Sequence, residues 1–125
     1  THVVSAFSQA LDELEAEGGI DARHKRYIAN QKTMVKGMRD IGFRTLIKDE
    51  VQSPIITSFY YPDSAGFDFH KLYDALKSRG FVIYPGKVSH AQCFRIGSIG
   101  DVHPSDMIEL IGHVSEVISE MGVRF

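Results

Sequence analysis

Cysteine is almost missing from this sequence, and long apolar runs are missing altogether. The single cysteine, Cys93, rules out an internal disulfide and fits a reducing cytoplasm. No apolar stretch approaches the ~20 residues that a membrane-spanning helix needs, so we expect no membrane contact. The first residues, Thr1 to Val4, have neither the basic nor the apolar region of a secretory signal and no initiating methionine. We therefore expect a cytoplasmic protein, present here as a processed or partial chain.

A strong excess of either charge is also missing. The 125 residues carry a formal net charge of −2, which disfavours a dedicated nucleic-acid-binding protein. The charge is nevertheless segregated: residues 1–20 contain four acidic side chains and no Lys or Arg, whereas residues 21–48 contain eight Lys or Arg. Two interpretations stay open, namely two helices lying side by side with complementary faces, or two independently solvated surfaces.

Apolar residues at helical spacing predict four helices. Gly18-Gly19 ends the first helix, Asp21 and Asp68 are candidate N-caps, and Pro104 suits a first helical position. The expected helices run over residues 3–17, from Asp21 to about Ile41, from Asp68 to Gly80, and from Pro104 to Gly122.

Four short segments rich in β-branched and aromatic residues predict strands. They are Phe43–Ile47, Ile55–Tyr61, Phe81–Tyr84, which Pro85-Gly86 should break, and Gln92–Ile96. Short turns between these segments favour antiparallel neighbours. We expect one α+β domain, a two-layer sandwich with a mainly antiparallel sheet of about four strands and helices packed on one face.

Arg95 is the candidate binding residue. Side chains alternate along a strand, so Phe94 and Ile96 should face the core, while Cys93, Arg95 and Gly97 share the other face. A guanidinium among small residues has room for a ligand, and its planar fork suits a carboxylate or phosphonate. From spacing alone, a surface arginine at the strand edge is the commoner alternative.

Other polar constellations predict no site. The histidines show no close metal-ligand spacing, so we predict no metal; they are His2, His24, His70, His90, His103 and His113. The basic run Arg23–Arg26 is interpreted as a solvated helix face, and Cys93 as a packing thiol within a strand.

Four segments carry a resemblance to a known family. The segment from Phe94 to Gly100, Phe-Arg-Ile-Gly-Ser-Ile-Gly, resembles the Arg-Ile-Gly signature in the small domain of class V aminotransferases. The segments Phe81–Lys87 and Gln52–Thr57, with the first helix, are similar to the branch that acts on 2-aminoethylphosphonate and pyruvate. The resemblance extends over nearly all 125 residues.

The resemblance implies that residues 1–125 are the C-terminal small domain of a homodimeric, fold-type I enzyme of phosphonate catabolism that uses pyridoxal 5'-phosphate. That enzyme would convert 2-aminoethylphosphonate and pyruvate to phosphonoacetaldehyde and alanine. Arg95 matches the family's arginine that binds the acidic group of the substrate. The cofactor lysine and the catalytic residues have no match here, so we expect them in a missing large domain and expect this fragment alone to be inactive.

Two alternatives remain open at this point. The chain could belong to another class V aminotransferase of the serine–glyoxylate or alanine–glyoxylate type, since such relatives share part of the signature. It could also be a free-standing α+β module that binds a ligand and needs no further domain.

Overall fold

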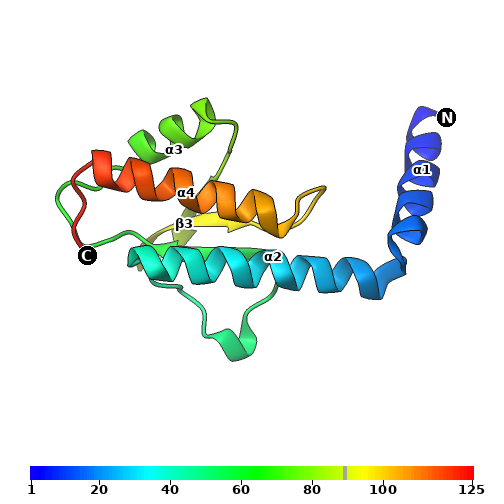
Figure 1. The fold of residues 1–125 in the computed structure, drawn as a ribbon, viewed down its shortest axis with the longest axis horizontal. Coiled ribbons are helices and arrows are strands. Elements are labelled where there is room, and N and C mark those ends of the chain that lie inside the picture. The colour runs from blue at the N-terminus through cyan, green and yellow to red at the C-terminus, as the bar shows by residue number, and fades with distance from the viewer. Residues whose placement is uncertain (89) are drawn as a thin grey trace.

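The chain folds into four helices and an antiparallel sheet, which confirms the α+β prediction. The computed structural model describes residues 1–88 and 90–125. In chain order the elements are α1 (His2–Glu17), α2 (Gly19–Ile41), the short 3-10 helix η1 (Asp49–Val51), β1 (Ile56–Tyr60), α3 (Phe69–Ser78), β2 (Tyr84–Val88), β3 (Ala91–Gly97) and α4 (Pro104–Glu120). Helices α2 and α4 lie side by side across one face of the sheet, and α3 packs on α4 (Figure 1).

The sheet has three strands in the order β1-β3-β2, one fewer than the predicted number of about four. Within the described residues, the expected strand over 43–47 is reduced to one bridge between Thr45 and Phe59. Two hydrogen bonds make this bridge, from the N–H of Leu46 to the carbonyl of Ser58 and from the N–H of Tyr60 to that of Arg44, while Phe43 still belongs to the end of α2, where its N–H donates to the carbonyl of Met38.

Strand β2 begins later than predicted and continues through the expected break. It starts at Tyr84 and includes Pro85 and Gly86. An edge strand tolerates proline because one row of its backbone groups has no ladder partner. A Cβ atom added at Gly86 would lie 3.0 Å from the carbonyl oxygen of Cys93, so glycine fits the close approach of β2 and β3.

Two predicted helix starts are confirmed and one is wrong. Asp68 caps α3, since its Oδ1 accepts from the backbone N–H of Lys71 at 3.2 Å, and Pro104 is the first residue of α4. Asp21, in contrast, lies in the first turn of α2, because that helix begins at Gly19. Gly18, with φ of 113°, makes the corner between α1 and α2.

The core lies between the sheet and the helices. Phe59 and Phe94, neighbours on β1 and β3, are fully buried with ring centroids 5.8 Å apart, and Phe43 packs edge-on at 5.5 Å from Phe94. Met34 and Met38 of α2 are fully buried against this cluster. Because Phe59, Phe94 and Ile96 point to the helices, the alternate residues of β1 and β3 form the opposite face, which we call the outer face of the sheet.

Helix α1 adds nothing to this core. It leaves the body of the domain at the Gly18 corner, and none of its residues is buried within the described chain (Figure 1). The two oppositely charged helices therefore meet at a corner. They do not lie side by side along their lengths.

Candidate functional site

Arg95 lies on the outer face of the sheet, in the middle of the central strand β3. Its neighbours across the ladder are Ser58 on β1 and Tyr84 on β2. The side chain is exposed, whereas Phe94 and Ile96 on either side are buried, as the alternation predicts. The fold therefore presents the guanidinium to solvent.

One edge of the guanidinium is occupied and the other is open. Nε and Nη2 donate to the carbonyl oxygen of Pro85 at 3.3 and 3.1 Å. Within residues 1–88 and 90–125, no carboxylate forms an ion pair with Arg95. The Nη1–Nη2 edge is thus free to grip an anion through two parallel hydrogen bonds, while Pro85 fixes the plane of the fork.

Small side chains lie next to Arg95 on the outer face, but not all of its neighbours are as open as predicted. Ser58 and Gly97 are small and half-buried, and Tyr84 is 53% exposed. Cys93, expected on the same open face, is fully buried, and burial raises the pKa of its thiol. The interpretation of Cys93 as a packing thiol is therefore confirmed, and the open space is restricted to the Arg95–Gly97 end of β3.

An apolar hollow adjoins that end of the strand. Its volume is about 630 Å³, and it lies between the β2–β3 edge and the start of α4. Tyr84 and Gly97 belong to its wall, and Met107 and Leu110 of α4 close it from the helix side. Its rim includes large apolar side chains that are exposed, namely Ile55, Ile56, Val82 and Ile99. Asp101 and Asp106 also line this hollow, which opens on the helix side of the sheet, and Arg95, on the outer face, is not part of its wall.

The loop that follows β3 is tied to the corner between α1 and α2. Nη1 of Arg26 donates to the carbonyls of Gly100 and Val102 at 2.7 and 2.6 Å, while its Nε donates to Glu17 at 2.5 Å. Arg23 also donates to Glu17, at 2.6 Å. These hydrogen bonds, that of Arg26 foremost, lower the pKa of Glu17 to about 2.

This corner corrects the interpretation of Arg23–Arg26 as a solvated face. His24 and Lys25 are exposed, but the Arg26 side chain is only 15% exposed and fully engaged. The ion pairs contribute stability above the ordinary carboxyl pKa near 4.5 and lose it as the pH falls towards 2, because the folded-state pKa of Glu17 is depressed.

Asn30 and Ser98 extend the same network into the interior. Both are fully buried; the Asn30 amide donates to the carbonyls of Ser98 and Val102, and the Ser98 hydroxyl to that of Pro54. Sequence reasoning missed Asn30. The available signal was a polar residue at a position where the spacing of Tyr27 and Met34 calls for an apolar one.

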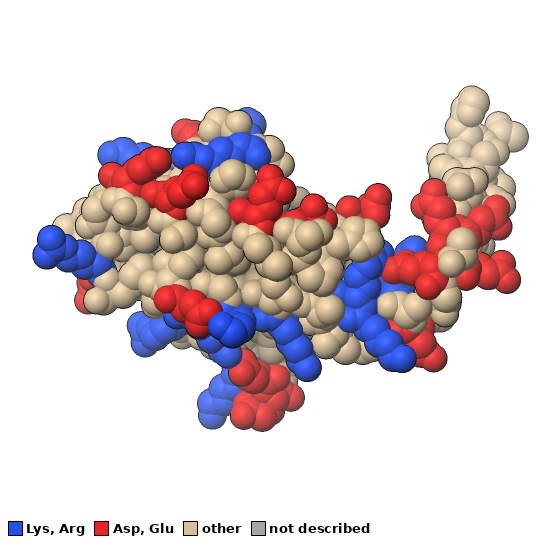
Figure 2. All heavy atoms as spheres, in the orientation of Figure 1, with Lys and Arg blue, Asp and Glu red and all other residues tan. Residues whose placement is uncertain are grey.

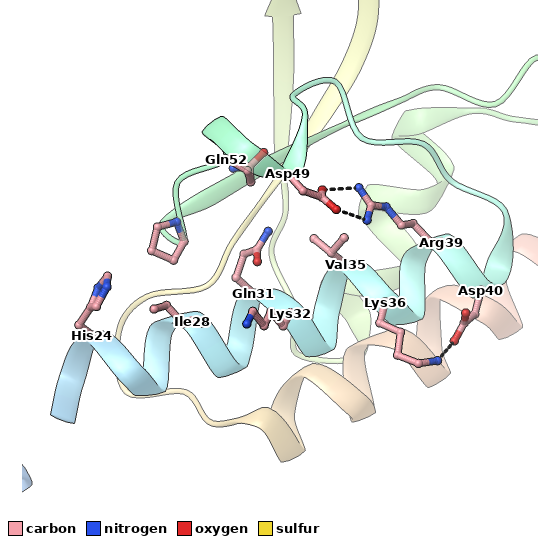
Figure 3. Close-up of a pocket in the computed structure, with 11 residues that line it drawn as sticks. His24, Ile28, Gln31, Lys32, Val35, Lys36, Arg39, Asp40, Asp49 and Gln52 are labelled. Carbon is pink, nitrogen blue, oxygen red and sulfur yellow. Dashed lines mark hydrogen bonds and ion pairs between the residues drawn. The ribbon is translucent and has the colours of Figure 1, made fainter. Parts of the chain in front are cut away.

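A second hollow, of about 580 Å³, lies between α2 and the segment around η1 (Figure 3). Its charged side chains largely neutralise one another: Arg39 grips Asp49 at 2.7 and 3.0 Å, and Lys36 pairs with Asp40. Arg95 lies in the wall of neither hollow. Because these charges are paired, the hollow is less suited to an anionic substrate than the open edge of Arg95 is.

No helix among residues 1–88 and 90–125 is long and apolar enough to cross a membrane. The same residues contain no group of three or more His, Cys, Asp or Glu side chains placed to hold a metal ion.

Comparison with known proteins gave strong matches to aminotransferases, although no family model matches the chain. It is 62% identical over 117 residues to a 2-aminoethylphosphonate–pyruvate transaminase of Phocaeicola vulgatus, and 59% identical over 118 residues to one of Vibrio vulnificus. Each match covers 94% of this chain and 32% of the relative. The chain thus spans about a third of the length of these curated relatives.

Solved structures give the same fold. Pyridoxamine–pyruvate aminotransferase from Mesorhizobium loti superposes with a TM-score of 0.79 at 26% identity, over 92% of this chain and 30% of that one. Ureidoglycine–glyoxylate aminotransferase from Bacillus subtilis superposes with a TM-score of 0.80 at 19% identity, over the same share of each chain, which supports the fold alone. Nearly all of this chain is therefore homologous to a segment, one third of the whole, of the 2-aminoethylphosphonate–pyruvate transaminases.

Proposed function

We propose that residues 1–125 are the C-terminal small domain of a 2-aminoethylphosphonate–pyruvate transaminase, and that Arg95 binds the acidic group of each substrate. The complete enzyme would transfer the amino group of 2-aminoethylphosphonate to pyruvate, giving phosphonoacetaldehyde and alanine in phosphonate catabolism. The observation that carries the proposal is the 56–62% identity to enzymes of that name over nearly all of this chain. The exposed fork of Arg95 supports the assigned residue.

The chemistry of the two substrates explains why one arginine would serve both. One substrate carries a phosphonate and the other a carboxylate, and both anions accept two parallel N–H bonds from the free edge of a guanidinium. The carbonyl of Pro85 fixes the plane of that guanidinium. Holding the acidic end in one place orients the reacting carbon, which is where proximity accelerates the reaction.

Pyridoxal phosphate is the cofactor that the proposal implies, and it would supply the electron sink for amino transfer. The family's cofactor lysine has no match among the seven lysines of this sequence. The six lysines other than Lys87 are all exposed, and Lys36 pairs with Asp40 on α2, away from β3. The proposal therefore assigns the cofactor and its lysine to the part of the enzyme outside residues 1–125, and the homodimer to the complete enzyme.

The test is made on the complete enzyme. We expect Arg95→Ala to lower kcat/KM for 2-aminoethylphosphonate by at least ~100-fold, about 2.7 kcal/mol of transition-state stabilisation. Arg95→Lys keeps the charge but loses the fork, so an intermediate loss is expected. Arg124→Ala, at an exposed arginine beyond the far end of α4, is the control and should leave kinetics unchanged.

The substrate panel decides between related activities. Pyruvate-dependent consumption of 2-aminoethylphosphonate supports the proposal, whereas a preference for serine or alanine with glyoxylate would reassign the enzyme within the class. Wild-type kinetics in Arg95→Ala would remove Arg95 from the site.

A further inference from the structure

Helix α1 presents an apolar stripe that nothing in the described chain covers. Val3, Val4 and Phe7 are 82%, 70% and 65% exposed, and Leu11 is 48% exposed. Their spacing puts them on one side of the helix, together with Ala10 and Leu14. In Figure 2 the far end of α1 shows no charged side chain, while acidic side chains gather at its base.

The direction of α1 is fixed by its base, so the helix is a placed arm and not a frayed end. Glu17, its last residue, forms ion pairs with both Arg23 and Arg26. Arg26 in turn donates hydrogen bonds to two carbonyls of the loop after β3. These contacts join the base of α1 to two other parts of the domain and set the angle at which the stripe leaves it.

Such an arm needs a covering surface. A helix of 16 residues is marginal in water without tertiary packing, and soluble domains rarely leave a contiguous apolar patch of this kind in solvent. The described chain supplies no cover, because α2 meets α1 only near their corner (Figure 1). The cover therefore comes from elsewhere.

The length of the relatives identifies that cover. They match 94% of this chain, yet the match accounts for only 32% of their own length. We propose that the apolar stripe of α1 packs into an apolar groove on the roughly two thirds of the parent enzyme that lie outside residues 1–125. This rests on the proposed function only in taking the parent to be a protein of the relatives' length.

The acidic side chains of α1 predict which charges the covering groove carries. The base of α1 carries Asp12, Glu13 and Glu15, and the helix contains no Lys or Arg. The covering surface should therefore carry cationic side chains at the end nearest the Gly18 corner and apolar ones further out, because opposed charge there avoids burying uncompensated carboxylates.

Hydrogen exchange in the complete parent enzyme tests the packing. We expect the amides of residues 5–16 to exchange at least ~100-fold more slowly than an unprotected peptide, because only a docked helix stays closed. Phe7→Asp should speed that exchange at least tenfold, whereas Ser5→Asp, which adds the same charge on the opposite side of α1, should not. Unprotected amides in the wild-type enzyme, or equal effects of the two variants, would overturn the proposal.

A photo-crosslink identifies the occupant. Phe7→p-benzoyl-phenylalanine in the parent enzyme should give a product of unchanged chain mass, crosslinked to a segment outside residues 1–125. A product of doubled mass would place a second copy on the stripe and overturn the proposal. An enzyme inactive on 2-aminoethylphosphonate with a protected α1 would contradict the proposed function alone, and an active enzyme with an unprotected α1 would contradict this inference alone.

Discussion

At the scale of single residues, two arginines one turn apart contribute unequally to the stability of the domain. Arg26 donates to a carboxylate and to two loop carbonyls and is 15% exposed, whereas Arg23 donates only to Glu17 and is 29% exposed. We expect Arg26→Met to lower the free energy of unfolding by about 2 kcal/mol, since charge-assisted bonds are lost and carbonyls are left unpaired. Arg23→Met should lower it by less than about 1 kcal/mol, as for a pair near the surface.

Urea unfolding of the two variants measures this difference. Equal losses would show that the Gly100 and Val102 carbonyls regain their bonds from water, and that the network around Arg26 is unimportant.

The sequence predicts interactions between residues a few positions apart, but it does not predict hydrogen bonds between residues far apart in the chain. The cap at Asp68 and the start at Pro104 depend on neighbours within three residues, so the sequence predicts them. Arg26 and Asn30 bind a loop more than 65 residues away, and no spacing rule reaches that far. For Arg95, alternation predicted an exposed side chain, but it could not predict that Pro85 would fix one edge of the fork.

At the scale of elements, the packing of α2 on α4 depends on one glycine. A Cβ atom at Gly37 would lie 2.6 Å from Cγ1 of Ile111, so the two helices approach closely there. We expect Gly37→Ala to destabilise the domain by about 1 kcal/mol, because overpacking of about 2 kcal/mol exceeds the helix-propensity gain of up to ~1 kcal/mol.

Gly112 is the matched control for that substitution. It lies within α4 with nothing within 4 Å of an added Cβ, so Gly112→Ala should stabilise by about 0.5–1 kcal/mol through helix propensity alone. Thermal unfolding with opposite signs for the two substitutions is the expected result. A gain at Gly37 would mean that Ile111 moves aside freely.

Strand prediction failed where tertiary context overrode composition. The segment 43–47 has good strand residues, yet it starts directly at the end of α2 and pairs with β1 through one bridge only. In β2, Pro85 and Gly86 read as a break but lie on a sheet edge, where missing donors and side chains are tolerated. Both errors concern position in the sheet, which the strand sequence itself does not contain.

At the scale of the whole molecule, the domain consists of a packed body and an arm. Composition predicted one domain, and the amphipathic pattern of residues 3–17 predicted a helix. The pattern could not say whether the apolar side of that helix would face this core or another surface, because periodicity reports a buried face and not its partner.

The division into body and arm predicts what happens when the arm is removed. Deleting residues 1–16 takes away no buried side chain and keeps Glu17, so the free energy of unfolding of the remaining chain should change by less than about 1 kcal/mol. Deleting residues 121–125 is the control: it removes Phe125, whose ring packs 5.0 Å from that of Phe43, and should destabilise by about 2 kcal/mol or more. Sedimentation velocity should show that the 125-residue chain self-associates through its bare stripe and that the chain lacking residues 1–16 does so less. If the first deletion unfolds the domain, α1 belongs to the body after all, and its exposed stripe requires another explanation.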